Sequence, residues 1–456
     1  MTRPTGFWLE GLEQPATTPV ERGVRADILI VGGGYTGLWT ALALQDSDPD
    51  LRIVVCEAQT VGFGASGRNG GFCEPSLTHG LANGLRHFPE ELRELEGLGD
   101  ASFKAMQDFL QAAEVDCDFE AVGMLDLAVA RWQVEELTEL AGLHAHYGQR
   151  AQLLDRDAVA ERVRSPMVLG GLLRPDGGGI LHPAKLAVGL RRVALERGIA
   201  IHERSPISGL RAGDGGVMAD TPGGLITADR AVVATNAYSA GVLRRTNRHF
   251  VPVHDHVLVS AVLTPTQRRA IGWEGREGLA DAGNQFHYFR LTPDDRILWG
   301  GYDAIYRYGG DLEEDPAEVA RIRRRLQAHF AQMFPALADL DFPYHWSGPI
   351  ATTTRFTPVF GHAMRGRVVY ALGYTGLGIA ASRFAGQVLT AMLTDPTSPL
   401  LRLRYTTSTP IPFPPEPVRW AGVQMVRRAI ARSDLRGGRR GPVLGALDRI
   451  GIGFDS

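Results

Sequence analysis

The sequence predicts a two-domain fold of the α/β plus α+β class, in which one domain is assembled from separated segments and a β-rich domain is inserted between them. Short apolar strands that end in a glycine or polar turn occur early, in the middle and late, with β-rich stretches between them. At 456 residues the chain is long enough for two or three domains. We expect the first domain to comprise residues 20–112, 168–240 and 345–398, the second to comprise 113–167 and 241–344, and 399–456 to form a proline-rich linker and a basic extension.

The first strand–turn–helix segment carries a dinucleotide-binding pattern. An apolar strand over residues 26–31 runs into Gly32, Gly34 and Gly37 at GxGxxG spacing, and Glu57 ends the next strand. The three glycines permit a tight turn, close approach of backbone N–H groups to a pyrophosphate, and close packing of helix on strand. The helix N-terminus favours the phosphate charge, and Glu57 can accept hydrogen bonds from an adenosine ribose. This pattern predicts an adenine dinucleotide site without separating NAD from FAD.

Two further glycine-rich stretches favour a flavin. Within residues 62–72, Ser66, Arg68 and Asn69 offer hydrogen-bonding groups among glycines that let the backbone approach a flat ring. NAD dehydrogenases have no regular need for such a stretch just after the ribose acid. A late glycine turn over 373–378 begins another helix and can present N–H groups and a helix dipole to the N1–O2 edge of a reduced flavin.

Over roughly residues 24–398 the chain resembles the D-amino-acid oxidase–like FAD-dependent oxidoreductases. The matching segments are Val31–Gly37 with Glu57, Gly64–Gly71, Ala234–Ser239, Trp346–Gly361 and Gly373–Gly378. Within that family it is most similar to the γ-glutamylputrescine oxidoreductase branch, which shares the GASGRNGG and ATNAYS motifs. The resemblance implies a Rossmann-like FAD-binding domain with an inserted β-sheet substrate domain, a two-domain fold of the glutathione-reductase type. It also implies oxidation of a CH–NH bond of an amine, with hydride transfer to flavin N5 and hydrolysis of the imine to a carbonyl.

The motifs and the resemblance together predict the residues that bind FAD. These are Gly32, Gly34, Tyr35, Thr36, Gly37, Glu57, Ala58, Gly64, Ala65, Ser66, Arg68, Asn69, Gly70, Gly71, Ile207, Thr235, Asn236, Gly373, Gly376, Leu377 and Gly378. Relatives that bond the flavin covalently use a cysteine or a histidine, and Gly348 and Arg68 stand at those two positions. We therefore expect non-covalent FAD. The alternative for Arg68 and Asn69 is that they only satisfy backbone groups of a turn.

The resemblance also bears on the substrate. Ile350, Glu74 and Ala380 stand where relatives hold a substrate carboxylate, and none of the three is cationic. An α-amino acid needs a guanidinium or an ammonium for its carboxylate, so we expect an amine, with a cationic end near Glu74. The alternative is an amino acid, an N-methyl amino acid or an aminophosphonate, whose anion Arg290 or Arg355 would hold. A non-catalytic flavin electron carrier is the alternative from another class.

The candidates for the catalytic site are Tyr288, His254, His256, Arg290 and Glu74. Alternate residues of a strand share a face, so Tyr288 and Arg290 point one way, and His254 and His256 share a face of another strand. The two histidines could line the substrate cavity or act as a base. Core packing and ordinary hydrogen bonding are the alternatives, and no metal site is predicted. Relatives place an oxygen-activating lysine where this chain has Leu298 or Trp299, so O2 activation would need another group, or the electrons pass to another acceptor.

Composition limits the partners and the compartment. The net charge of −3 gives no indication of nucleic-acid binding. Three cysteines without pairing spacing, the lack of an apolar secretory segment in the first 25 residues and the lack of a long apolar run together predict a cytoplasmic protein without a transmembrane segment. An arginine-rich helix over about 416–432 is expected to dock on the enzyme's own body or on a second subunit, as part of a homo-oligomer. A membrane-surface helix is the alternative.

Overall fold

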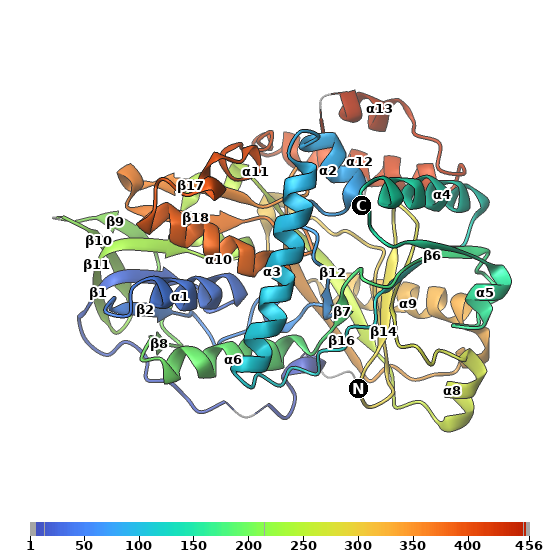
Figure 1. Ribbon diagram of the computed structural model, residues 1–456, viewed down its shortest axis with the longest axis horizontal. Coiled ribbons are helices and arrows are strands. Elements are labelled where there is room, and N and C mark those ends of the chain that lie inside the picture. Colours follow the sequence, from blue (N-terminus) through green and yellow to red (C-terminus); the bar gives the residue numbers. More distant parts are fainter. Residues whose placement is uncertain (1–5, 13, 214, 450, 453–456) are drawn as a thin grey trace.

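The computed structural model describes residues 6–12, 14–213, 215–449 and 451–452, and in that part of the chain two large sheets lie side by side (Figure 1). The fold class expected from the sequence is confirmed: the first sheet is mostly parallel and covered by helices, and the second is mostly antiparallel. No helix among the described residues is long and apolar enough to cross a membrane.

The first sheet is built around the N-terminal strand. In it β1 pairs in parallel with β2 and β11. The buried apolar runs of β2 and of the C-terminal half of β1 suit a sheet that is covered on both faces. The strand order is β17 (Val359–Ala363), β18 (Val368–Leu372), β11 (Gly224–Val233), β1 (Val24–Val31), β2 (Ile53–Cys56) and β8 (Ala200–His202), with β10 (Val217–Thr221) and β9 (Leu210–Ala212) beside β11. Helices α1 (Tyr35–Ser47), α6 (Pro183–Glu196) and α10 (Ile379–Thr394) bury their apolar faces against it.

The second sheet receives strands from both halves of the chain. Its order is β16 (Tyr344–Thr352), β12 (Val251–Val259), β15 (Ile297–Gly301), β14 (His287–Leu291), β13 (Gly278–Asp281), β4 (Met124–Ala128), β6 (Gly170–Arg174) and β5 (Gln152–Asp155). Helix α9 (Pro316–Met333) covers one face, where its buried Phe330 packs on Trp299 of β15. The opposite face looks towards the first sheet.

Two predicted domain boundaries differ from these strand memberships. We placed 168–240 and 345–398 in the first domain, whereas β6 and β16 both belong to the second sheet. The reason is pairing: β6 is antiparallel to β4, and β16 is antiparallel to β12 along its whole length. Apolar alternation predicts a strand but does not say which sheet the strand joins.

The remaining elements connect and cover the sheets. Two helices, which end at His87 and begin at Leu92, are separated near Pro89, since proline does not continue a helix. The further helices are α2 (Leu81–His87), α3 (Leu92–Ala112), α4 (Arg131–His146), α5 (Arg156–Ala160), α7 (Ser239–Val242), α8 (Pro265–Ile271) and α11 (Arg404–Thr407). A short pair, β3 (Phe72–Cys73) with β7 (Gly179–Ile180), lies between the two sheets.

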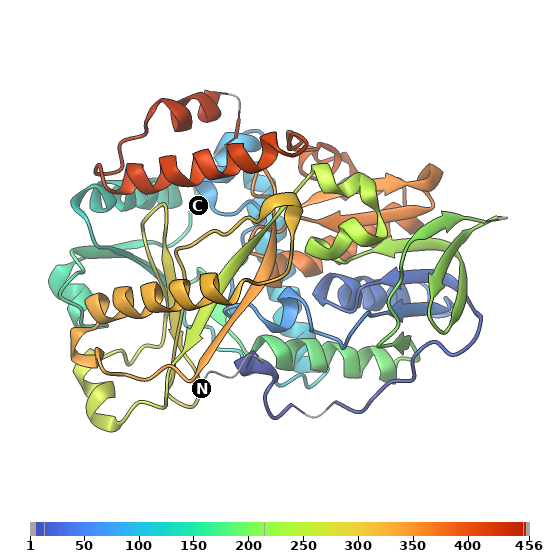
Figure 2. The ribbon, with the colours of Figure 1, turned by 180° about the vertical axis from the view of Figure 1, so that it is seen from behind.

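The C-terminal extension folds back over the second-sheet half of the molecule, as Figure 2 shows in red. Helix α12 (Val418–Asp434) is followed by α13 (Pro442–Arg449). At the end of α12, the Asp434 carboxylate accepts hydrogen bonds from the backbone N–H groups of Asn284 (3.2 Å) and Gln285 (3.0 Å) and from the Asn284 amide (2.6 Å). At its start, Glu416 accepts hydrogen bonds from the Tyr306 hydroxyl and the Gly309 N–H. Helix α12 is therefore attached to the chain's own body, and we call it the C-terminal roof.

Candidate functional site

A cavity of about 1490 Å³ lies between the two sheets. The carboxyl end of β1, the loop over residues 64–70 and the start of α10 line one part, and β12, β14 and the C-terminal roof line the other. Pockets that bind a single drug-sized ligand have volumes of roughly 300–1,000 Å³. The cavity is therefore large enough for a dinucleotide and a second small molecule.

The glycine turn after β1 has the geometry that a phosphate site needs. A Cβ on Gly37 would stand 2.0 Å from the Gly32 carbonyl oxygen, so only glycine allows α1 to approach β1 this closely. Gly32 itself has a φ of +109°. The Glu57 carboxylate accepts hydrogen bonds from the backbone N–H groups of Gly33 (2.8 Å) and Gln59 (2.9 Å). Burial raises the pKa of Glu57, and these two donors oppose that rise.

The loop over 64–71 is held rigidly against this turn. The Ser66 hydroxyl accepts a hydrogen bond from the Tyr35 N–H (3.0 Å), which joins the loop to the start of α1. The Asn69 amide is used within the loop: it donates to the Ala65 carbonyl (2.9 Å) and accepts from the Gly71 N–H (2.8 Å). For Asn69 the geometry thus favours the alternative of a turn-stabilising residue. Arg68, by contrast, lines the cavity and stacks on a phenylalanine ring.

The late glycine turn is tied to the other two segments. The Asn236 amide oxygen accepts a hydrogen bond from the Gly373 N–H (2.9 Å), and the hydroxyls of Thr36 and Tyr374 lie 2.7 Å apart. Helix α10 begins directly after Gly378 and directs its N-terminus to the cavity. Three segments that are distant in sequence therefore meet at one wall.

Most of the predicted cofactor residues line the cavity, and the exceptions are three glycines. Gly37, Gly71 and Gly373 lie behind the wall, where a Cβ on any of them would stand 2.0–2.3 Å from a neighbouring atom. The cradle formed by the glycine turn, the ribose acid and the N-terminus of α10 fits an adenine dinucleotide with a flat ring system.

On the second-sheet side, Tyr288 and Asp255 face the cavity together. The Tyr288 ring is packed between Gly70 and Gly300, where a Cβ on either glycine would stand 2.7 or 2.6 Å from a ring carbon. Its hydroxyl donates a hydrogen bond to the Asp255 carboxylate. Burial raises the pKa of Asp255 to about 6, and burial also raises the pKa of Tyr288. The candidate residues predicted from the sequence include Tyr288 but not Asp255.

Glu74 lines the cavity but does not offer a free charge. Its carboxylate lies 3.0 Å from a guanidinium nitrogen of Arg174, and Arg174 also lies 3.0 Å from the Asp126 carboxylate. All three residues line the cavity. Pattern reasoning missed Arg174, which neutralises one of the two carboxylates, so the expected cationic substrate end near Glu74 would meet one remaining negative charge shared by Glu74 and Asp126.

The two histidine candidates point away from the cavity. In β12 the cavity-facing residues are Val251, Val253, Asp255 and Val257, so His254 and His256 lie on the covered face. His256 Nδ1 lies 3.2 Å from a ring nitrogen of His345, and burial lowers the pKa of His256 to about 3. These histidines do share a face, as expected, but the proposal that they line the substrate cavity is wrong.

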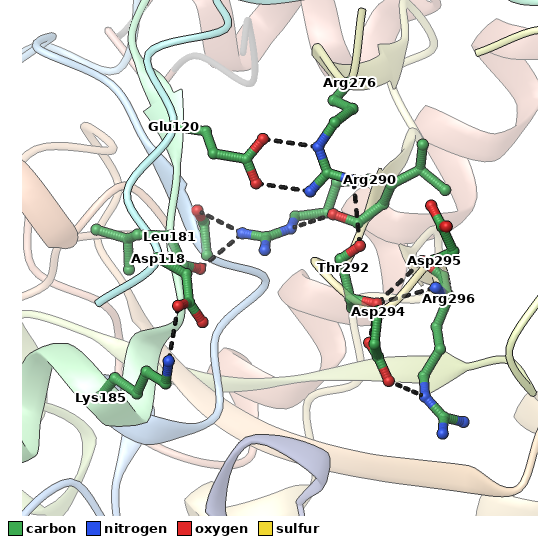
Figure 3. Close-up of polar contacts among 12 residues, drawn as sticks. Asp118, Glu120, Leu181, Lys185, Arg276, Arg290, Thr292, Asp294, Asp295 and Arg296 are labelled. Atoms are coloured by element: carbon green, nitrogen blue, oxygen red, sulfur yellow. Dashed lines mark hydrogen bonds and ion pairs between the residues drawn. The ribbon is translucent and has the colours of Figure 1, made fainter. Parts of the chain in front are cut away.

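The two arginines proposed as anion anchors also lie outside the cavity wall. Arg290 donates to the backbone carbonyls of Gly71 (3.2 Å) and Leu181 (2.6 Å), beside the Arg276–Glu120 ion pair (Figure 3). Burial lowers the pKa of Arg290 to about 9.

Arg355 binds other parts of the chain. Its guanidinium donates to the hydroxyls of Thr357 (2.8 Å) and Ser408 (2.7 Å), and it does not line the cavity. Leu298 and Trp299, which stand at the oxygen-activating position of relatives, are both fully buried in apolar clusters.

Sequence reasoning missed several cavity residues besides Asp255 and Arg174. Asp303 lies 2.7 Å from Arg325 and 3.8 Å from Arg427 of the C-terminal roof, and Asp281 lies 2.6 Å from His287. No local pattern distinguishes these acids from surface carboxylates, because their partners come from other elements.

The fold and the cavity define a two-domain, dinucleotide-binding protein with a second ligand space over a β-sheet. Residues 27–392 match the family model described as FAD dependent oxidoreductase, DAO. The chain therefore belongs to this family of FAD-dependent oxidoreductases, and the family expected from its motifs is confirmed.

Individual relatives agree with this assignment. The chain is 30% identical over 394 residues to a probable oxidoreductase OrdL of Rhizobium meliloti, covering 84% of this chain and 86% of that protein. It is 29% identical over 379 residues to gamma-glutamylputrescine oxidoreductase of Escherichia coli, covering 82% and 85%. The structure is similar to glycine oxidase from Geobacillus kaustophilus, with a TM-score of 0.67, 21% identity and coverage of 81% of this chain and 95% of that one. It is also similar to L-proline dehydrogenase from P. horikoshii, with a TM-score of 0.70, 18% identity and coverage of 84% and 97%.

Proposed function

We propose that the protein oxidises the CH–NH bond of an amine that lacks an α-carboxylate, with non-covalently bound FAD and with O2 as the electron acceptor. The observation that carries this proposal is the placement of the arginines. Arg290 and Arg355 bind other parts of the chain, and the cavity-lining Arg174 is paired with two carboxylates. Arg68 also lines the cavity, but it lies in the cofactor loop and stacks on Phe63. The other cavity-lining arginines, which are in the C-terminal extension, have partners there or on Asp303: Arg419, Arg427 and Arg440. An α-amino acid would need one such guanidinium for its own carboxylate.

The named relatives support chemistry at a carbon–nitrogen bond. One is a gamma-glutamylputrescine oxidoreductase, and others are sarcosine oxidase and glycine oxidase. When bound, FAD supplies a two-electron acceptor for the hydride of the substrate carbon. The chain's own residues hold that cofactor at three segments, exclude bulk water with the C-terminal roof, and position the amine against the face of the second sheet.

The experiment is anaerobic titration of the purified holoenzyme with simple alkylamines and diamines, and separately with glycine, sarcosine and an aminophosphonate. We expect the amines to bleach the flavin absorption near about 450 nm. Bleaching by the anionic compounds alone would replace this proposal with the amino-acid alternative. If neither the amines nor the anionic compounds bleach the flavin, the remaining hypothesis is a non-catalytic flavin electron carrier. Peroxide formation during aerobic turnover then distinguishes O2 from another acceptor.

The absence of a covalent link is a separate proposal. Gly348 stands where one group of relatives has a bonding cysteine, and Arg68 stands where another has a bonding histidine. Acid precipitation should therefore release yellow cofactor into the supernatant. A yellow pellet would contradict a non-covalent site.

We further propose that the enzyme works in a reducing compartment, such as the cytoplasm. Cys56, Cys73 and Cys117 are all free and buried, and burial raises the pKa of each thiol, which makes them inert.

A further inference from the structure

One carboxylate of the cavity differs from the others in its partners. The other cavity carboxylates with described partners are held by arginines, by an imidazole ring or by backbone donors: Glu57 by backbone N–H groups, Glu74 and Asp126 by Arg174, Asp281 by His287, and Asp303 by Arg325. Asp255 accepts a hydrogen bond from the Tyr288 hydroxyl, and the nearby backbone N–H groups of His256 and Gly301 also favour its ionised form. In the part of the chain that the structure describes, no arginine, lysine or histidine forms an ion pair with it.

The position of Asp255 places this charge between the cofactor segments and the second-sheet wall. It stands directly opposite Gly348 of β16, and a Cβ on Gly348 would stand 3.7 Å from the Cβ of Arg68 in the cofactor loop. Tyr288, which holds the carboxylate, itself packs on Gly70 of the same loop. The carboxylate therefore lies where a substrate must come to reach the flavin segments.

The electrostatics favour a cationic ligand at this point. Burial without a neighbouring cation disfavours the ionised carboxylate, whereas the Tyr288 hydroxyl and the two backbone donors favour it. A bound ammonium group would supply the missing positive charge. On either side along β12, Val253 and Val257 also face the cavity and offer apolar surface to the carbon chain of such a ligand.

We propose that Asp255 binds the ammonium group of the substrate amine and accepts one of its protons, while Tyr288 positions the carboxylate. This inference rests on the proposed function. In the proton transfer, an N–H bond of the ammonium breaks, its electron pair stays on nitrogen, and the proton bonds to a carboxylate oxygen of Asp255. The products are a neutral amine, whose C–H bond is then open to oxidation, and a neutral carboxylic acid; nothing is oxidised or reduced in this step.

The first test measures binding without turnover. The probe is tert-butylammonium chloride, which has no hydrogen on its α-carbon and so is not a substrate for CH–NH oxidation, and tert-butanol is its neutral isostere. Binding to oxidised holoenzyme is followed by the flavin spectrum and by calorimetry. We expect Asp255→Asn to weaken ammonium binding by about ten-fold or more and to leave tert-butanol unaffected, since only the charge is removed. Glu139→Gln, which removes an exposed carboxylate at the cavity rim, is the matched control and should change the Kd less than about two-fold.

The second test is the pH dependence of that binding. Wild-type affinity should rise with pH through about 6, as Asp255 loses its proton. The affinity of Asp255→Asn for the ammonium should not rise with pH in this range. In Tyr288→Phe the rise in affinity should occur at higher pH, because the carboxylate loses a hydrogen-bond donor. Tyr288 is the titratable side chain in contact with Asp255, and Arg68 lies behind Gly348. His254 and His256 point to the other face, and burial keeps the pKa of each well below this range.

The outcomes separate this inference from the proposed function. If no amine reduces the wild-type flavin, the proposed function fails. If amines reduce it, but Asp255→Asn binds the ammonium as tightly as wild type, or the wild-type affinity does not change with pH near 6, the inference alone fails. Should Asp255→Asn not retain FAD, the wild-type pH series still decides.

Discussion

At the residue scale, Gly37 shows how a missing side chain positions the cofactor site. A Cβ there would fall on a backbone oxygen that cannot move without displacing β1. Gly37→Ala should therefore lower the free energy of unfolding by about 1–3 kcal/mol and weaken FAD retention. The matched control is Gly97→Ala on α3, where a Cβ meets nothing within 4 Å and the helix gains about 0.5–1 kcal/mol. Urea unfolding measures the stability of the two variants, and the ratio of flavin to protein measures their FAD retention. Equal behaviour of the two variants would contradict the steric explanation.

Arg290 gives a second prediction at this scale. Its guanidinium connects Gly71 of the cofactor loop to Leu181, so its role is to hold the loop. Arg290→Gln should lower stability by about 2–4 kcal/mol, since buried carbonyls lose a charged donor, and should leave the preference between cationic and anionic amines unchanged. The measurements are urea midpoints and relative kcat/KM values. A selective loss of activity on anionic amines would restore Arg290 as an anion anchor.

The sequence predicts single residues well where the requirement is local. The glycines, Glu57 and Ser66 are predicted because a turn, a ribose acid and a cofactor loop follow each other within one short segment. The faces of β12 are different. Alternation shows that His254 and His256 share a face, but only pairing with β16 and coverage by α9 determine that Asp255 takes the cavity side. Which face of a strand lines the cavity therefore depends on contacts between distant segments, and local sequence patterns do not show these contacts.

At the element scale, the covered face of β12 and β16 carries a cluster of neutral histidines. Burial lowers the pKa of His254 and His345 to about 4 and of His256 to about 3. In the unfolded chain each would titrate near about 6.5, so between these values the unfolded state binds more protons than the folded state. Stability is therefore fully present above about pH 6.5 and is lost as the pH falls towards 4.

The histidine cluster therefore predicts a measurable dependence of the free energy of unfolding on pH. Between about pH 7.5 and 5.5 the free energy of unfolding should fall by roughly 3–4 kcal/mol from these three histidines, and His256→Asn should reduce the fall by about a third. The protonation of Asp255, whose folded pKa is raised, acts in the opposite direction and is unchanged by this variant. His146→Asn on exposed α4 is the control and should retain the wild-type slope. Parallel slopes for wild type and His256→Asn would exclude the cluster as the cause.

The elements themselves were largely predictable, and their assembly was not. The expected helix over 416–432 lies close to α12 as observed, because its apolar positions recur at helical spacing. That it covers the cavity follows from Asp434 reaching Asn284 and Gln285, which are distant in sequence. Similarly, the residues of β6 and most of those of β16 fall within ranges expected in the first domain, whereas both strands pair within the second sheet.

At the scale of the whole molecule, the C-terminal roof joins two ends of the chain across the cavity. Asp434→Ala removes its hydrogen bonds to the 284–285 loop, and each hydrogen bond to a charged group is worth about 1.5–3 kcal/mol. We expect trypsin to cleave the arginines of α12 at least about ten-fold faster in this variant. Asp220→Asn, in an exposed ion pair with Arg211 of the first sheet, should leave the cleavage rate unchanged. Unchanged cleavage in Asp434→Ala would show that apolar packing alone holds the roof.

The roof also has a consequence for the order of biosynthesis. The family fold spans residues 27–392, so every segment of the dinucleotide cradle leaves the ribosome before α12. A nascent chain thus presents an open cradle that FAD can enter before the last wall is added. In a fully folded protein without FAD, by contrast, the C-terminal roof already narrows the entrance to the cradle. Reconstitution of the stripped protein should accordingly be slower than cofactor uptake during synthesis, and the delay should disappear once the helix is released.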